Sequence, residues 1–210
     1  MRPSPTPLLT DDGRLTPMAV DLLAALAAVD RDLLLRARVK RTGGEVLWFP
    51  WYRRRRGGGA FVVGRTIRFT PNWYAATGYG RSSFGDRSRR STLRWLMHLA
   101  HEVGHLPQAE RFGQQALGRL RYLLAFAGQY GSRALLGRWP VHDGAPLERE
   151  ADRGRWVLRE LLVQDRRKGL LLVKAVQAGD RDAVLGWLRQ ATPLIGQLQT
   201  RYDRELAMAR

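Results

Sequence analysis

The stretch LMHLAHEVGHLPQ, residues 96–108, holds three of the four histidines of the chain within eight positions. In it, His101, Glu102 and His105 fit the pattern H-E-x-x-H. On an α-helix, positions i and i+4 project from one face a turn apart, so both imidazoles can reach one Zn²⁺ ion. Glu102 lies about 100° round the helix from His101, where its carboxylate can hold a zinc-bound water. Because zinc lowers the pKa of that water to about 7, the pattern predicts a hydrolytic zinc site with Glu102 as general base. A helix that packs and binds nothing is the alternative.

The remaining ligands are limited by spacing and composition. His98 lies two turns from His105, about 10.5 Å along a helix axis, which is too far for a third ligand on the same ion. We therefore expect His98 to have a packing role. A two-histidine site needs a third protein ligand and an open position for water. The chain has no cysteine, and His142 is the one histidine left, so a carboxylate is the natural candidate.

The segment LEREADRGRWVLRELL, residues 147–162, supplies such carboxylates. Glu148 and Asp152 are spaced i and i+4 on a helix predicted near 146–164, beside an apolar stripe. One of them can ligate zinc while the other orients a ligand histidine. Glu150 points elsewhere on this helix and is expected in solvent. A charged surface on an amphipathic helix is the alternative, because arginines surround these acids.

H-E-x-x-H on one helix followed by E-x-x-x-D on a later one resembles the gluzincin class of zinc metallopeptidases, and EREAD is similar to the E-x-x-A-D of several bacterial branches. Residues 60–113 resemble, through GRTIRFTPNWY, a loop and LAHEVGHLPQAERFG, the metallopeptidase domains of bacterial polymorphic toxins and of contractile-injection-system effectors. The resemblance implies a zincin-like fold.

The same resemblance implies roles for particular residues. It implies that His101, His105 and Glu148 ligate Zn²⁺, that Glu102 is the general base or acid, and that Asp152 orients a ligand histidine without binding the metal. It also implies that a strand at 62–69 lies beside the cleft, where an extended peptide can pair antiparallel to its edge. Two departures stand out: Pro107 interrupts the motif helix, and the helices after residue 166 have no counterpart in the family.

The residue that stabilises the tetrahedral oxyanion has no position in these motifs. Three side chains are candidates: His142, Tyr130 and Tyr74. We take His142 as the best of them, because it lies six residues before Glu148.

The hydrophobic pattern predicts an α+β chain that is mostly α. We expect a flexible tail over residues 1–14 and a single zincin-like domain over 15–210. In it, residues 15–113 hold an N-terminal helix, a small antiparallel or mixed sheet and the motif helix, and residues 114–210 form a C-terminal helical bundle.

The elements before the motif are predicted from local signals. A helix of about 18 residues begins at Thr16-Pro17. Short strands are expected at 36–41 and 45–52, and a longer one at 60–69. In the last, four side chains are expected to alternate on one face: Phe61, Val63, Ile67 and Phe69. A loop rich in Gly, Ser and Arg is expected at 75–90.

The charge of the chain suggests partners but identifies none. The formal net charge is +17, from 36 Lys and Arg against 19 Asp and Glu. Such a field attracts nucleic acid, an anionic membrane or an acidic protein partner, for instance a component of an injection apparatus. Arg53 to Arg56 suit a phosphate-rich partner, with a solvated loop as the alternative. No nucleic-acid-binding motif is present, so we expect nucleic acid to bind only non-specifically.

Targeting signals are weak. The N-terminal residues lack the apolar core of a signal peptide, and the most apolar window, Leu22 to Ala28, is far too short to cross a bilayer. We expect a soluble protein with no transmembrane segment, cytoplasmic in the producing cell, whose export would use no cleaved signal peptide.

Three functions follow from these features. The first is a zinc metallopeptidase of effector or toxin type that hydrolyses a protein or peptide. The second is a catalytically silent zincin-fold module for docking or loading in a secretion or injection apparatus. The third is a basic nucleic-acid-binding protein, which we rank last.

Overall fold

The computed structural model describes residues 6–41, 59–70, 89–142 and 144–208. Over these residues the fold is mostly helical with one small sheet, which confirms the predicted α+β class. The strands are β1 (Arg38–Arg41), β2 (Ala60–Val63) and β3 (Thr66–Phe69). The helices are α1 (Pro17–Ala27), α2 (Arg31–Arg36), α4 (Arg89–Glu102), α5 (His105–Phe112), α6 (Ala116–Leu135), α7 (Pro146–Ala151), α8 (Arg153–Gln164), α9 (Arg166–Ala178) and α10 (Arg181–Met208).

The N-terminal region is more ordered and more broken than its sequence predicts. Part of the predicted tail is packed: Leu8 and Leu9 are buried, and Leu9 forms a bridge with Leu15. The single helix predicted from Thr16 is two helices. Ala28 adopts a left-handed conformation with φ 53°, and the Asp30 carboxylate accepts a hydrogen bond from the Leu33 amide, so a new helix begins there.

The sheet is mixed. In the described part of the chain its strand order is β1-β3-β2, with β1 parallel and β2 antiparallel to β3. The single strand predicted at 60–69 was wrong, because Gly64, at φ 59°, turns the chain into a hairpin. Residues paired across a hairpin share a face, and Val62 lies opposite Ile67. Phe61 and Val63 therefore lie on the other face from Ile67 and Phe69.

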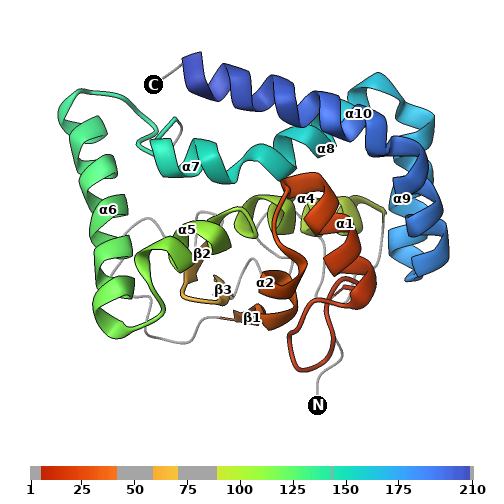
Figure 1. Cartoon of the computed structure of the whole chain (residues 1–210), viewed down its shortest axis with the longest axis horizontal. Helices are drawn as coiled ribbons and strands as arrows, with labels where there is room; N and C mark the ends of the chain where they lie inside the picture. The colour runs from red at the N-terminus through yellow and green to blue at the C-terminus, as the bar shows by residue number, and fades with distance from the viewer. Residues whose placement is uncertain (1–5, 42–58, 71–88, 143, 209–210) are drawn as a thin grey trace.

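The C-terminal helices pack on the N-terminal half. Helix α8 contacts α1 and α4, and α10 contacts α1, α8 and α9. One hydrophobic cluster extends from Leu8 to Leu198 and includes side chains of the sheet. Figure 1 shows α7 and α8 lying across α4 and α5, while α6 lies at one margin of the molecule. The fold thus brings the motif helix and the EREAD segment together.

The helix predicted near 146–164 is also divided, with α7 ending at Ala151 and α8 beginning at Arg153. Asp152 is the junction residue between them. Several predicted features lie outside the described residues: the strand at 45–52, the arginines 53–56, Tyr74 and most of the 75–90 loop. Where the chain is described, we find no helix with the length and apolarity needed to cross a membrane.

Candidate metal centre

The two motif histidines lie on either side of a helix break. Helix α4 ends at Glu102 and α5 begins at His105, so the prediction of one helix carrying the whole motif was wrong. Pro107 explains where the break falls: it has no N–H to donate to the carbonyl four residues earlier, and it is tolerated in the first turn of a helix. The Val103 carbonyl accepts instead from the Leu106 amide at 3.1 Å, and the Gly104 amide donates to the His101 carbonyl at 2.9 Å, so tighter turns keep the two histidines near one another.

Glycine at position 104 lets α7 approach this break. A Cβ added to Gly104 would lie 2.2 Å from the Ala151 carbonyl oxygen and 2.7 Å from the Ala151 Cα. The backbone of Gly104 is ordinary helical, with φ −64° and ψ −23°, so the requirement is for space and not for a special conformation. The close contact places Glu148 and Asp152 beside the histidines.

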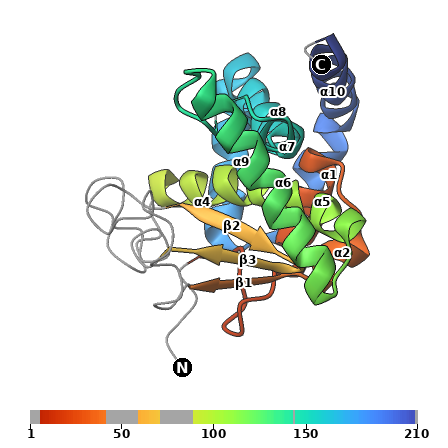
Figure 2. The same ribbon diagram turned by 90° about the vertical axis from the view of Figure 1, so that its left-hand side faces the viewer.

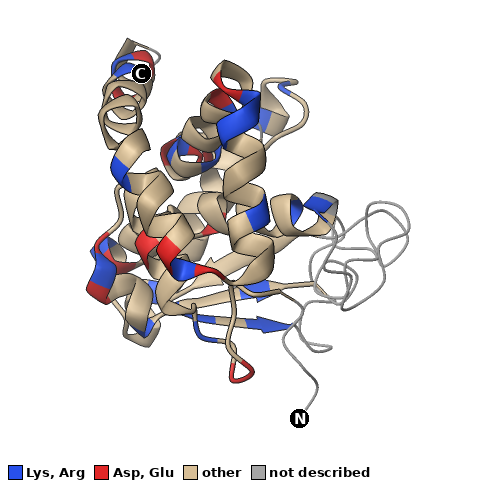
Figure 3. Ribbon diagram, turned by 90° about the vertical axis from the view of Figure 1, so that its right-hand side faces the viewer, with Lys and Arg blue, Asp and Glu red and all other residues tan. Residues whose placement is uncertain are grey.

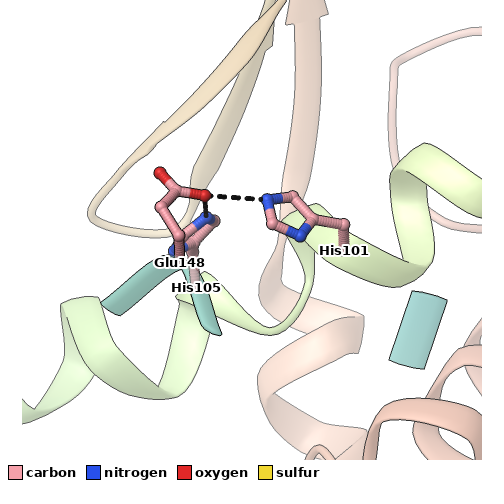
Figure 4. Close-up of side chains that lie close together, drawn as sticks. All are labelled: His101, His105 and Glu148. Atoms are coloured by element: carbon pink, nitrogen blue, oxygen red, sulfur yellow. Dashed lines mark hydrogen bonds and ion pairs between the residues drawn. The ribbon is translucent and has the colours of Figure 1, made fainter. Parts of the chain in front are cut away.

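Glu148 reaches both imidazoles, as Figure 4 shows. Its Oε2 lies 3.1 Å from His101 Nε2 and 3.6 Å from His105 Nε2. His101, His105 and Glu148 can each offer one ligand atom, with all three atoms within 4.8 Å of one another. Ligand atoms bound at about 2.0–2.1 Å to a tetrahedral zinc lie roughly 3.3 Å from one another. The three ligand atoms of this group need to move only slightly closer together to bind such an ion.

Each histidine is oriented by a hydrogen bond from its other ring nitrogen. His101 Nδ1 lies 3.0 Å from Asp152 Oδ1, and His105 Nδ1 lies 2.9 Å from Gln108 Oε1. The Gln108 amide donates to the Leu147 carbonyl at 2.8 Å, which turns its oxygen toward the imidazole, so Nδ1 of His105 carries the hydrogen. Both Nε2 atoms then face Glu148. This is the arrangement by which carboxylates and amides fix metal-ligating histidines.

Glu102 is buried, at 5% exposure, and its Oε2 has no hydrogen-bond partner among the described residues. An unsatisfied buried carboxylate oxygen is costly, and such groups concentrate where function requires them. Burial raises the pKa of Glu102 above its ordinary value, although the neighbouring imidazoles oppose this. A general base that receives a proton from a water needs such an unoccupied acceptor.

The carboxylates give the site a negative electrostatic potential. Burial lowers the pKa of His101, but hydrogen bonds with Asp152 and Glu148 outweigh it and raise that pKa to about 9. Burial raises the pKa of Glu148 and of Asp152, yet contact with the imidazoles holds both below their ordinary values. Arg155 also lies against Asp152 and lowers the pKa of that carboxyl. The same negative charge would stabilise a divalent cation.

An apolar cavity of about 630 Å³ adjoins the group. Strand β2 and helix α6 supply most of its lining, and His105, Tyr130 and Glu148 belong to it. The Tyr130 hydroxyl donates a hydrogen bond to Glu148 Oε1. In the described sheet β2 is an edge strand, whereas β3 is central. β2 is the strand that lies beside the cavity, and only the first part of the strand predicted at 62–69 lines this cavity.

Other predicted residues lie apart from the three potential ligands. His142 is exposed in the turn between α6 and α7 and is not among the residues that line the cavity, so the structure does not bring it to the site. His98 lies on α4, half buried, and burial and then Arg155 lower its pKa to about 3. Glu150 pairs with Arg111 at 2.8 Å.

Two side chains lie at the site although the sequence favours neither of them: Tyr130 and Gln108. Closeness in sequence to Glu148 favours His142 over Tyr130, because nothing in the sequence reveals that the Tyr130 hydroxyl of α6 reaches Glu148 of α7. Gln108 lies three residues after His105, a spacing that puts both on one helical face and could have indicated the contact.

Neither a protein-family model, nor a curated protein, nor a solved structure matches this chain. A functional assignment therefore depends on the motif and on the arrangement of these side chains.

Proposed function

We propose that this protein is a zinc-dependent metallopeptidase of gluzincin type, with His101, His105 and Glu148 as metal ligands. The observation that carries the proposal is the convergence of two Nε2 atoms and one carboxylate oxygen beside the unpartnered Oε2 of buried Glu102. Two imidazoles and a carboxylate are a donor set typical of catalytic zinc, and the chain has no cysteine for a closed thiolate site. A zincin-like fold and a bacterial effector or toxin role belong to the same proposal.

The residues divide the work of peptide hydrolysis between them. A bound Zn²⁺ polarises a carbonyl oxygen and lowers the pKa of water to about 7. Glu102 Oε2 accepts a proton from the attacking water while the water oxygen bonds to the scissile carbonyl carbon. Glu102 then gives that proton to the amine nitrogen as the C–N bond breaks. Asp152 and Gln108 hold the imidazoles in place, and Tyr130 holds Glu148.

The substrate has a natural place along β2. Strand β2 lies at one edge of the described sheet and lines the cavity that His105 and Glu148 border. An extended peptide that follows this strand can place alternate side chains in the apolar cavity.

Metal content tests the ligand assignment. The purified protein should contain about one zinc per chain, and a chelator should remove it with loss of thermal stability, because binding stabilises the folded state. Elemental analysis and a melting curve before and after adding Zn²⁺ measure both. A native protein that stays metal-free and does not melt higher with Zn²⁺ would exclude the site.

Asp152→Asn should weaken zinc binding by about 10–100-fold, since loss of the carboxylate that orients a ligand histidine has that typical cost. Competition with a zinc-sensitive dye measures the change. Glu150→Gln is the matched control, because Glu150 lies two residues before Asp152, on α7, and pairs with Arg111 instead. Equal affinities of the two variants would show that Asp152 does not support the metal.

A further inference from the structure

Exposed apolar side chains concentrate on one segment, the α6 ridge, which we define as the outward-facing residues of 117–139. Of the twelve large hydrophobic side chains exposed in the described part of the chain, seven lie in this segment. They are Leu117, Leu120, Leu123, Leu124, Leu135, Leu136 and Trp139. Leu135 is 90% exposed and Trp139 73%. Contiguous exposed apolar surface of this kind marks an interaction site.

Three leucines of the α6 ridge lie on one face of the helix. Leu117, Leu120 and Leu124 are spaced i, i+3 and i+7, which places them on the same side. The opposite side packs inward, where Tyr122 is buried and its ring contacts Phe126 at 5.0 Å. A Cβ added to Gly128 or Gly131 would meet nothing within 4 Å, so the outer face is open there too. In Figure 2, which looks onto this side, α6 lies in front of β2 and α5.

The charged side chains of residues 111–142 are all basic, although Arg111 pairs with Glu150 of α7. Residues 111–142 contain five arginines and no aspartate or glutamate. Arg119, Arg121 and Arg138 are exposed. Elsewhere basic and acidic side chains are interspersed, as on the opposite side of the molecule in Figure 3. The partner of the ridge is thus apolar and negatively charged.

We propose that the α6 ridge is a peripheral membrane-binding surface for anionic phospholipid. A helix of this kind lies in the plane of the interface, its apolar face about 5–10 Å into the headgroup and acyl boundary. Arginines beside the leucines contact anionic headgroups, and a tryptophan at the helix end suits the interface. The ridge lies on a helix at the margin of the molecule, where it can reach a flat lipid surface.

Membrane binding would orient the candidate metal centre. Leu123, Leu124 and Trp139 belong to the ridge and also line the cavity that reaches His105 and Glu148. The cavity would therefore open beside the bilayer surface. Membrane binding itself needs no metal and no catalysis, so it can be tested apart from the proposed function.

Co-sedimentation with phosphatidylcholine vesicles, with and without phosphatidylglycerol, tests the inference. The full chain should bind the anionic vesicles and lose binding as salt rises. The triple variant Leu117→Gln/Leu120→Gln/Leu124→Gln should bind at least about 100-fold more weakly, because three buried leucines are lost from the interface. Arg119→Gln/Arg121→Gln/Arg138→Gln should lose about 10–100-fold.

Matched variants separate the α6 ridge from the overall charge of +17. Arg166→Gln/Arg167→Gln/Arg189→Gln removes the same charge from α9 and α10, and Val163→Gln/Leu170→Gln/Leu171→Gln removes exposed apolar side chains from α8 and α9. Both should bind nearly as the unmodified chain does. Three results would overturn the inference: no binding to anionic vesicles, equal losses in ridge and control variants, or a solution dimer that the leucine variant abolishes.

Discussion

Glu102→Gln should retain about one zinc per chain and lose peptide hydrolysis by about 10²–10⁴-fold, the usual contribution of a general acid–base group. Glu102 is not one of the three potential metal ligands, and its Oε2 has no hydrogen-bond partner among the described residues. A glutamine side chain can therefore replace the Glu102 carboxylate without removing a metal ligand. The glutamine amide cannot take a proton from water. Cleavage of fluorescently labelled casein and of a mixed peptide library, with zinc analysis of the same samples, measures both properties.

His105→Ala provides the complementary control. It removes a ligand, and it should therefore lose zinc and hydrolysis together. Should the Glu102→Gln protein cleave as fast as the unmodified chain, Glu102 is not the base. Should the unmodified chain bind zinc yet cleave no casein and no library peptide, the site is a silent zinc module of the kind expected for docking or loading.

Each of the two motifs could be found from sequence because it depends on local spacing, and the resemblance to gluzincins suggested their pairing. The spacing of His101 and His105 and the carboxylates of EREAD indicate the chemistry of zinc ligands, although the two histidines lie on either side of a helix break and not on one helix. The structure places Glu148 Oε2 3.1 Å from one imidazole and 3.6 Å from the other, and Asp152 on the far nitrogen of His101. The prediction that these four side chains share one region agrees with this geometry.

Features that depend on tertiary packing were not accessible. His142 was preferred as the oxyanion group because it precedes Glu148 closely in sequence, but it is exposed, and Tyr130 reaches Glu148 from another helix. Periodicity also cannot reveal that Gly64 turns a run of alternating residues into a hairpin, or that Asp30 starts a second helix. In the last two cases one residue with a turn or capping role overrode a longer pattern.

Gly104→Ala should destabilise the fold by about 2–4 kcal/mol, at or above the usual range for overpacking, because the added methyl meets backbone and not a flexible side chain. The added Cβ would lie 2.2 Å from the Ala151 carbonyl oxygen, so α5 and α7 must separate. For a chain of this length the loss corresponds to a fall in Tm of about 5–15 °C. Circular dichroism melting and urea denaturation measure it.

Gly196→Ala is the matched control, since it makes the same chemical change inside helix α10, where a Cβ meets nothing within 4 Å. It should be neutral or stabilising by up to about 1 kcal/mol, as alanine favours the helix over glycine. Gly104→Ala should also weaken zinc binding, because Ala151 precedes Asp152 and lies in the same short helix as Glu148. A Gly104→Ala protein as stable as the unmodified chain would mean that the approach of α7 to the motif does not require glycine, and that the second x of H-E-x-x-H is unconstrained here.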